Sequence, residues 1–172
     1  MIAIAAMSKN RVIGNKGTIP WHVKEDFQWF KEFTMGKTLV MGRRTYDSIP
    51  PLKGRKICVL SSNPLTMWDD CVLSKKSDRL YVRTTRSFIS ELEEDLSSDR
   101  ELTDKDETWI NSVVAGGAKT YTLLLPYITK FYVTHIDGEY EGDTFMSPFE
   151  HLLPIQEIIK EFGSHKVVKY SK

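Results

Sequence analysis

The chain has 172 residues, which is enough for one ordinary domain with a single core and short for two. Its 24 Lys and Arg residues nearly balance its 23 Asp and Glu residues, so the formal net charge of +1 offers no global field that would attract nucleic acid or an anionic membrane. We therefore expect a monomer with one active site for small molecules, in a single domain over residues 1–172.

Several sequence features favour a cytoplasmic protein. The start, MIAIAAMSKNRVIG, has no basic leader or cleavage site and predicts a first strand, and no stretch is long and apolar enough to span a bilayer. Cys58 and Cys71 lack the CxxC spacing of redox or zinc sites, so we expect free thiols in a reducing compartment. The four histidines lack the short spacing of metal ligands, and no metal site is expected.

Short apolar runs alternate with helical patterns along the chain, which is typical of an α/β fold with a mainly parallel sheet. The apolar runs predict strands over residues 2–7, 38–42, 56–61, 80–82, 109–116 and 130–136. Between them, helices are predicted over residues 24–34, 44–48, 86–96 and 118–124. Two alternating segments around Gly163 predict a terminal β-hairpin, and the acidic segment 91–107 predicts a helix end followed by an exposed loop.

Two of the predicted strands end in glycine directly before a helix. Gly42 is followed by Arg43 and Arg44 in a first helical turn, where free N–H groups favour anions and two guanidinium groups suit a phosphate monoester. Gly116 and Gly117 would let the backbone approach a pyrophosphate closely. A purely structural junction explains either turn alone equally well, but the pair predicts a dinucleotide site. Neither turn matches the GxGxxG pattern of Rossmann folds, so the cofactor would be held by a different arrangement.

Asp26 lies on an aromatic stripe of the first predicted helix. Asp26 and Phe30 are four residues apart and share a face, with Phe27 beside them. A carboxylate that is desolvated in this way should have a raised pKa, which suits a site that binds and polarises a protonatable heterocycle. The alternative is that Phe27, Phe30 and Phe33 are simply core, and that Asp26 caps the helix or leans outward.

The sequence resembles the dihydrofolate reductase family over most of its length. The matching motifs stand in the family's order and at approximately its spacing: IAAMSKNRVIG, IPW followed by KEDFQWFK, VMGRRTYDSI, LKGRK, LSS, VVAGGAKTY and VTHIDGEYEGDT. The resemblance implies a mainly parallel eight-stranded sheet flanked by four helices. It also implies an oxidoreductase that uses NADPH to reduce 7,8-dihydrofolate to 5,6,7,8-tetrahydrofolate, supports one-carbon metabolism and thymidylate synthesis, and is a target of antifolates.

The resemblance further implies how the substrate is bound. Asp26 would hydrogen-bond the pterin N3 and 2-amino group, and its charge would favour protonation of N5 by water while NADPH delivers hydride to C6. Thr134 would support this carboxylate, and Trp21 would order an active-site water. Arg55 would form a charge-assisted pair with the glutamyl α-carboxylate. Besides Asp26, Thr134 and Arg55, the substrate contacts would be Ile4, Ala5, Phe27, Phe30, Ile49, Leu52 and Tyr121.

The cofactor contacts implied by the resemblance fall into three groups. The nicotinamide would be bordered by Ala6, Tyr121 and a mobile loop made of Ile13, Gly14, Asn15, Lys16 and Gly17. The adenosine 2'-phosphate would be bound by Arg43, Arg44, Thr45 and Ser62, which argues for NADPH over NADH. The remaining contacts would come from Gly42, Leu60 and Ser61, and from Gly116, Gly117, Ala118, Lys119 and Thr120 at the pyrophosphate. Arg83 is expected near the adenosine end.

The chain departs from the family pattern in three places. Ala115 and Ala118 replace a bulkier residue and a third glycine, residues 63–108 match poorly, and the segment after Pro148 is similar only in composition.

Two other functions were weighed. One is the related reductase of riboflavin biosynthesis, which shares the sheet and uses NADPH on a different pyrimidine, although Asp26 after Trp21 argues against it. The other is a non-catalytic protein that keeps the fold, such as a folate-binding component of a larger assembly.

Overall fold

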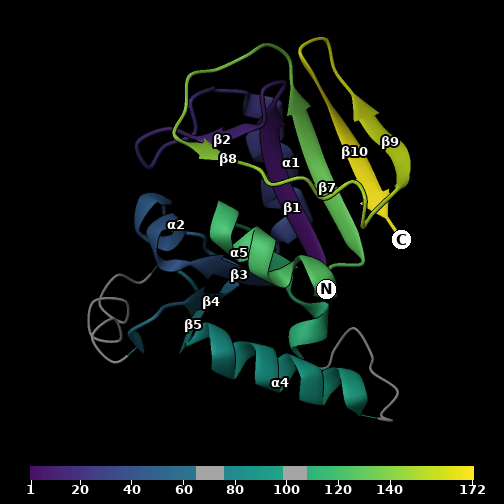
Figure 1. Ribbon diagram of the computed structural model, residues 1–172. Coiled ribbons are helices and arrows are strands. Elements are labelled where there is room, and N and C mark those ends of the chain that lie inside the picture. The colour runs from purple at the N-terminus through teal and green to yellow at the C-terminus, as the bar shows by residue number, and fades with distance from the viewer. Residues whose placement is uncertain (65–75, 99–107) are drawn as a thin grey trace.

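An eight-stranded sheet forms the centre of the molecule. The computed structural model describes residues 1–64, 76–98 and 108–172, and its sheet has the strand order β5-β4-β3-β6-β1-β7-β10-β9 (Figure 1). The parallel strands are β5 (Arg79–Arg83), β4 (Lys56–Leu60), β3 (Thr38–Gly42), β6 (Val113–Val114), β1 (Ile2–Ser8) and β7 (Lys130–Ile136). The antiparallel strands are β10 (His165–Ser171) and β9 (Ile155–Glu161). The predicted mainly parallel sheet and the terminal hairpin are confirmed.

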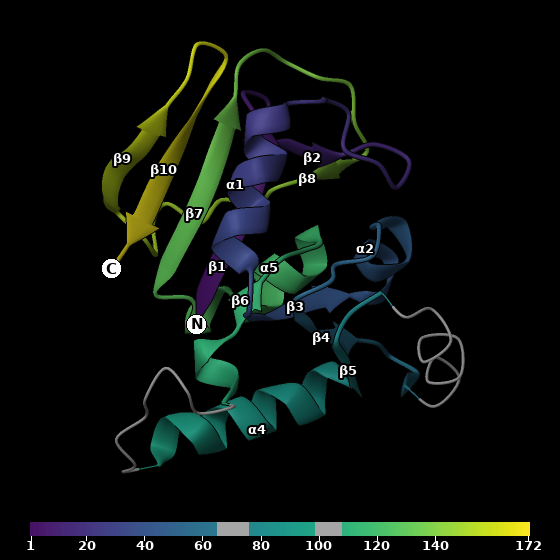
Figure 2. The same ribbon diagram turned by 180° about the vertical axis from the view of Figure 1, so that it is seen from behind.

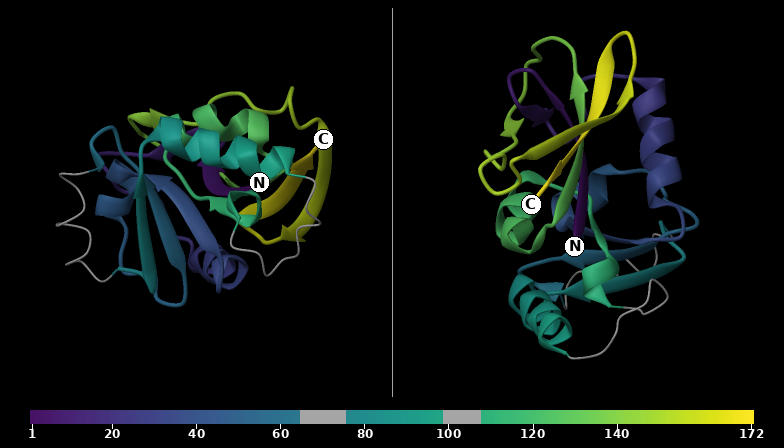
Figure 3. Two further views of the ribbon diagram at one scale, coloured as in Figure 1. Left: turned by 90° about the horizontal axis from the view of Figure 1, so that it is seen from below. Right: turned by 90° about the vertical axis from the view of Figure 1, so that its right-hand side faces the viewer.

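Helices cover both faces of this sheet. The described residues include four α-helices, α1 (Lys24–Thr34), α2 (Arg43–Ser48), α4 (Thr85–Ser97) and α5 (Ala118–Leu124). Trp29 and Phe30 of α1 and Tyr46 of α2 belong to one apolar cluster, whereas Phe88 of α4 and Leu124 of α5 belong to another. Figure 2 shows α1 in front of the strands, and the left view of Figure 3 shows α4 and α5 on the opposite side. The α/β architecture and the four predicted helices are confirmed.

The parallel strands bring two predicted binding turns together. β3 pairs directly with β6, with Leu39 opposite Val113 and Val40 opposite Val114. Their carboxyl ends therefore lie at the same edge of the sheet, where ligands bind in open α/β folds. Fully buried apolar residues such as Leu39 and Val40 stabilise these strands, at about 25 cal/mol per Å² of apolar surface removed from water.

A short ribbon of two strands lies beside the main sheet. β2 (Val12–Gly14) pairs antiparallel with β8 (Thr144–Phe145). Beyond β2 the chain turns back between Asn15 and Thr18, which exchange two backbone hydrogen bonds of 2.8 and 2.9 Å. The ribbon therefore supports the loop that was predicted to border the nicotinamide.

The strand predicted over residues 109–116 is wrong in its first half. Trp109–Asn111 form a single 3-10 turn, and only Val113–Val114 pair in the sheet. The backbone N–H of Trp109 donates to the carboxylate of Asp95 at 2.8 Å. Because the preceding helix supplies this acceptor, tertiary contacts override the strand preference of the apolar run.

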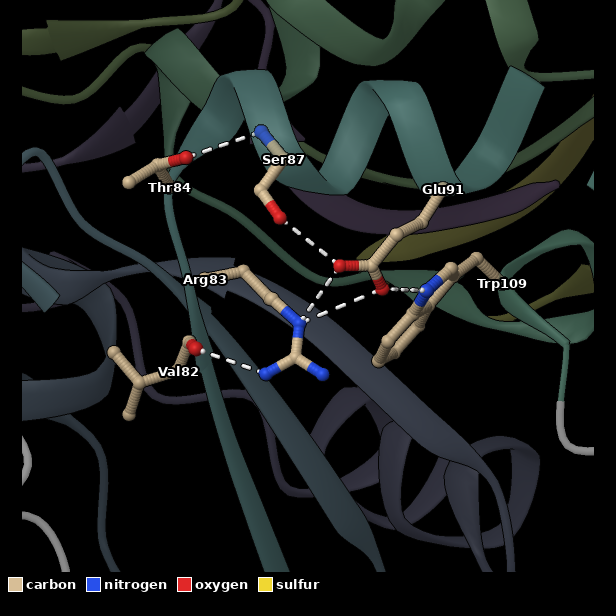
Figure 4. Close-up of polar contacts among 6 residues, drawn as sticks. All are labelled: Val82, Arg83, Thr84, Ser87, Glu91 and Trp109. Atoms are coloured by element: carbon tan, nitrogen blue, oxygen red, sulfur yellow. Dashed lines mark hydrogen bonds and ion pairs between the residues drawn. The ribbon is translucent and has the colours of Figure 1, made fainter. Parts of the chain in front are cut away.

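A polar network fixes the same turn to α4 and β5. The indole N–H of Trp109 donates to Glu91 at 2.8 Å, and Glu91 also accepts hydrogen bonds from Arg83 Nε at 3.0 Å and from Ser87 Oγ at 2.9 Å (Figure 4). The Thr84 hydroxyl caps α4 by accepting the N–H of Ser87 at 3.0 Å. Glu91 is thus the centre of a network that links a strand, a helix and a turn.

Two further sequence predictions touch regions outside the described residues. The helix end predicted in the acidic segment is confirmed by α4, which ends at Ser97, but residues 99–107 lie outside the described part of the chain. Cys58 is a free, buried thiol in β4, and burial raises its pKa to about 12. Cys71 lies outside the described residues.

Candidate active site

Asp26 is a buried carboxylate in the first turn of α1. Only 8% of the residue is exposed, and burial raises its pKa. The nearby Thr134 hydroxyl and His165 act in the opposite direction by favouring the ionised form. The predicted desolvation of Asp26 is therefore confirmed, and the alternative in which it leans outward is wrong.

Thr134 reaches Asp26 because of the sheet register. Ala6 of β1 lies opposite Thr134 of β7, which is only 1% exposed. Its hydroxyl makes no hydrogen bond of standard geometry within the described residues, although it lies close enough to lower the pKa of Asp26. A buried hydroxyl and a buried carboxylate therefore face one another with hydrogen-bonding capacity to spare.

The aromatic stripe of α1 divides between core and surface. Phe33 packs on Tyr132 with ring centroids 4.7 Å apart, and Phe30 joins the apolar cluster under the helix. Phe27, by contrast, is 41% exposed. The alternative that assigned all three phenylalanines to the core is therefore wrong for Phe27, which can contact a ligand.

The predicted substrate residues line both sides of this helix. Ile4, Ile49 and Leu52 belong to the same apolar cluster as Phe30. Ala5 packs instead against the cluster on the opposite face of the sheet, because successive residues of a strand alternate in direction. The structure thus groups the predicted substrate residues of α1 and α2, but turns the side chain of Ala5 away from them.

Arg55 is a buried cation near the C-terminal end of α1. It is 6% exposed, and its Nη1 donates to the Thr34 hydroxyl at 3.5 Å. Its Nε has no hydrogen-bond partner among the described residues. Burial lowers the pKa of Arg55, and the charge of Asp78 opposes this effect. An anion that contacted Arg55 would meet a guanidinium with unused donor capacity.

The two glycine turns form a shared cradle at the other edge of the sheet. The N–H of Gly42 donates to the carbonyl of Gly116 at 2.8 Å. A Cβ at Gly117 would lie 2.9 Å from the Thr45 hydroxyl, and a Cβ at Gly42 would lie 3.0 Å from that of Thr120. Gly116 has a φ of +120°, a conformation that favours glycine. Side chains at these positions would fill the space between the turns.

The remaining predicted cofactor residues surround this cradle. Leu60 lies opposite Gly42 in the β3–β4 pair, and Ser61 and Ser62 continue from it. The N–H groups of residues 118–120 precede the first α5 hydrogen bond, which runs from Tyr121 N to the Gly117 carbonyl at 3.0 Å, so these donors face outward from the helix start.

Two arginines begin α2 beside the same turns. Arg44 is exposed, whereas Arg43 Nε lies 3.5 Å from the carboxylate of Asp47. Arg83, which was expected near the adenosine end, is paired with Glu91 in the network of Figure 4. The structure thus places two of the three arginines in the turn after β3, where their charges can meet an anion.

Tyr121 connects the glycine cradle with Asp26. Its hydroxyl donates to the Ile4 carbonyl at 2.6 Å and lies 3.6 Å from the position that a Cβ of Gly116 would occupy. Burial raises the pKa of Tyr121, and the charge of Asp26 adds to this effect. The buried acid and the paired turns therefore belong to one continuous site.

Asp143 was given no role from the sequence, although it stands in the quoted motif VTHIDGEYEGDT. Its carboxylate accepts the backbone N–H of Lys16 at 2.9 Å, and this hydrogen bond lowers the pKa of Asp143. The Lys16 loop is therefore fastened to the segment before β8. The useful signal was the Asp-Thr pair of the motif, since the Thr144 hydroxyl also donates to Asp143 at 2.8 Å.

Trp21 lies at the opposite side of the loop. It is 6% exposed and packs edge-on against Tyr140, with ring centroids 5.2 Å apart. Its indole N–H has no partner among the described residues. A buried donor of this kind fits a site that holds a water molecule.

Searches for metal clusters and membrane helices were negative. Within residues 1–64, 76–98 and 108–172, no group of three or more His, Cys, Asp or Glu side chains could hold a metal ion. In the same part of the chain, no helix is both long and apolar enough to cross a membrane.

The fold and the site define an α/β domain in which a buried acid shares one site with a dinucleotide-type cradle. The chain belongs to the dihydrofolate reductase family, whose model, described as dihydrofolate reductase, matches residues 1–158. This match includes residues 63–108 and extends beyond Pro148, where the sequence resemblance was weak.

Individual relatives agree with this assignment. A dihydrofolate reductase of Bacillus subtilis is 36% identical over 149 residues, covering 86% of this chain and 75% of the relative. One from Mycobacterium tuberculosis (strain H37Rv) is 39% identical over 138 residues, covering 78% and 70%. Among solved structures, a dihydrofolate reductase from Enterococcus faecalis complexed with NADP(H) and RAB-propyl has a TM-score of 0.73 and 27% identity, and the match covers 99% of this chain and 94% of that one.

Proposed function

We propose that the chain reduces 7,8-dihydrofolate to 5,6,7,8-tetrahydrofolate with NADPH. The observation that carries the proposal is the connection of buried Asp26, through Tyr121, to the glycine cradle of Gly42 and Gly116. Family membership supports the reaction, and the Enterococcus faecalis relative was solved with NADP(H) bound. The riboflavin-type reductase is not the family that matches.

Asp26 is the acid that recognises the pterin. A buried carboxylate accepts two parallel hydrogen bonds, such as those from a ring N–H and an adjacent amino group, better than any neutral side chain at this position would. Its raised pKa means that the pterin meets a carboxylate whose charge is poorly solvated. That charge favours protonation of the substrate at N5, and Thr134 holds the carboxylate in place.

Trp21 positions the proton donor. Its buried indole N–H can donate to one water molecule at the entrance of the site, and that water supplies the N5 proton. Asp26 then acts electrostatically, without passing its own proton to N5.

The residues present fit NADPH. Absent side chains at Gly42, Gly116 and Gly117 leave the space in which a backbone can approach a pyrophosphate. Arg43 and Arg44 can pair with a 2'-phosphate, together with Thr45 and Ser62, and Ala6 with residues 13–17 can border the nicotinamide. When bound, NADPH supplies the hydride that adds to C6 of the substrate.

The tail of the substrate lies along α1. Phe27 and Phe30 contact its aromatic portion from one side, and Ile49 and Leu52 from the other. Arg55 pairs with the α-carboxylate of the glutamate. Ile4 and Tyr121 close the inner end of the pocket, and Ala5 contributes through its backbone.

The decisive experiment is the absorbance assay for NADPH with the purified chain. We expect NADPH to be oxidised only when dihydrofolate is present, and much more slowly when NADH replaces it. A protein that binds both molecules without turnover would instead be a non-catalytic binder. We further propose that residues 1–172 act as a single-domain monomer in the cytoplasm, which sedimentation and cell fractionation can test.

A further inference from the structure

A cavity lies beside Arg55, at the edge of the sheet opposite the glycine cradle. Its volume is about 370 Å³, and it is lined by Gly36, Gly54, Arg55, Lys56, Asp78 and Arg79. These residues stand at or just before the amino ends of β3, β4 and β5. The proposed substrate pocket uses only Arg55 among them, so the cavity continues beyond it.

Helix α1 gives the distance between the two regions. Asp26, Phe30 and Thr34 follow one another at intervals of four residues, and Thr34 accepts the hydrogen bond from Arg55. At a rise of about 1.5 Å per residue, Asp26 and Thr34 are about 12 Å apart along the helix axis. Gly36, which lines the cavity, follows two residues later. A ligand that runs from Asp26 to Arg55 therefore ends at the mouth of the cavity.

Two backbone contacts shape the cavity wall. Gly36 N donates to the Gly54 carbonyl at 2.8 Å, and Asp78 N donates to the Arg55 carbonyl at 3.0 Å. Gly36 and Gly54 have φ values of +74° and +78°, so each makes a turn that other residues adopt at a cost. The wall is thus built from cross-linked turns.

The charge of the lining favours an anion. Arg55, Lys56 and Arg79 contribute three positive charges and Asp78 one negative charge, which gives a formal net charge of +2. The Asp78 carboxylate already accepts the N–H of Gly54 at 2.9 Å. Buried Arg55, 6% exposed, has an Nε without a partner in the described part of the chain. One unused donor and two flanking cations therefore surround the space.

We propose that this cavity binds the carboxylates of an extended substrate tail, so that the preferred form of dihydrofolate carries additional γ-linked glutamates. The inference rests on the proposed function and deepens it. Arg55 takes the α-carboxylate of the first glutamate. The γ-linked extension then passes Arg55 and enters the cavity, where Lys56 and Arg79 meet its further carboxylates.

The test compares dihydrofolate monoglutamate with dihydrofolate triglutamate as substrates. We expect a KM about five-fold lower for the triglutamate at low salt, a size typical of a few partly exposed ion pairs, with kcat unchanged. The preference should shrink as salt is added, because exposed charge pairs are screened. Equal KM values for the two forms at low salt would overturn the proposal.

Two variants assign the effect to the cavity. Arg79→Gln and Lys56→Gln should each remove part of the triglutamate preference and leave the kinetics with monoglutamate unchanged. Arg86→Gln is the matched control, because Arg86 is an exposed arginine of α4 outside the cavity lining, and it should change neither. Loss of activity with both substrate forms in the cavity variants would point to misfolding, which thermal unfolding would detect.

Binding measurements separate this proposal from the proposed function. The affinities of folate monoglutamate and folate triglutamate can be measured by tryptophan fluorescence without turnover. Tighter binding of the triglutamate in a protein that does not oxidise NADPH would refute the reductase activity and retain the cavity. Inorganic phosphate serves as the free-anion probe. If phosphate at matched ionic strength abolishes the preference as fully as Arg79→Gln does, the cavity selects any anion and tail specificity is refuted.

Discussion

The N–H of Gly42 donates a 2.8 Å hydrogen bond to the carbonyl of Gly116, although the two residues are far apart in the sequence. This bond continues the β3–β6 pairing beyond the last strand residues and holds the two turns in fixed register. The cradle is therefore a single rigid unit, which makes its response to substitution predictable.

Gly117→Ala should weaken NADPH binding and destabilise the fold. The new Cβ would lie 2.9 Å from the Thr45 hydroxyl, so one of the turns must shift. We expect a loss of about 1–3 kcal/mol in the free energy of unfolding, as for other overpacked sites. Urea unfolding and NADPH titration measure the two effects.

The double variant Gly117→Ala/Thr45→Ala is the control for this substitution. It removes the hydroxyl that the methyl group meets, so stability should recover in part even if NADPH binding does not. A double variant no more stable than Gly117→Ala would show that the clash with Thr45 is not the cause.

Asp26→Asn should lose most turnover at neutral pH. Asparagine has nearly the same shape but lacks the charge that favours N5 protonation, and we expect a loss of about 10²–10⁴-fold in kcat. In acid, where solvent supplies protons directly, the deficit should shrink. Stopped-flow measurement of hydride transfer across pH provides the test, and a variant with unchanged turnover at neutral pH would remove Asp26 from the mechanism.

The same substitution should make the protein more stable at neutral pH. The pKa of Asp26 is raised in the folded state, so between the unfolded and folded values the folded protein holds more protons. The free energy of unfolding therefore falls as pH rises through this window, and ionised Asp26 is destabilising above it. Removing about 1 kcal/mol of this cost would raise Tm by about 2–4 °C at neutral pH.

At pH values below the unfolded pKa of an aspartate, about 3.9, the advantage of Asp26→Asn should vanish, because the carboxyl is protonated in both states. Asp137→Asn is the comparison, since the side chain of Asp137 is 63% exposed. Its Tm should follow that of the unmodified chain at every pH. An Asp26→Asn protein less stable than the unmodified chain at neutral pH would contradict the burial argument.

Arg44→Gln should reduce the preference for NADPH over NADH. An arginine that meets a phosphate forms charge-assisted hydrogen bonds worth about 1.5–3 kcal/mol, so KM for NADPH should rise by about 10- to 150-fold. KM for NADH should hardly change, because NADH lacks the 2'-phosphate. Equal effects on both cofactors would mean that Arg44 contacts a different part of the nucleotide, and Arg86→Gln should alter neither value.

Asp143→Ala should release the loop around Lys16. The carboxylate accepts the Lys16 N–H at 2.9 Å, and the pKa of Asp143 is lowered by this bond, so its stabilising effect is present above the unfolded pKa and is lost as pH falls through the folded one. We expect faster hydrogen exchange at the Lys16 amide and a lower kcat, since loops that cover a site often limit turnover. Asp137→Ala, in the same motif, is the control and should leave the Lys16 amide protected.

Local patterns predicted most of this site, and long-range contacts account for what they missed. Asp26 and its aromatic neighbours could be placed because a helix fixes which residues share a face. Trp109 was misplaced because its turn depends on acceptors from α4, which no local pattern reveals. Asp143 was missed for a similar reason, since its partner Lys16 lies 127 residues earlier in the chain. The cavity beside Arg55 depends on three separate turns and could not be expected from any one of them.

The position of β1 in the sheet has a consequence for how the molecule folds. Ile2 lies beside Val113 of β6 and Lys130 of β7, so the first strand to leave the ribosome waits for both neighbours until most of the chain has been made. Contacts between residues so distant along the chain slow folding, because a long loop must close before they form. During synthesis the apolar residues of β1 remain without their strand partners, and chaperones that bind extended apolar segments should recognise this stretch first.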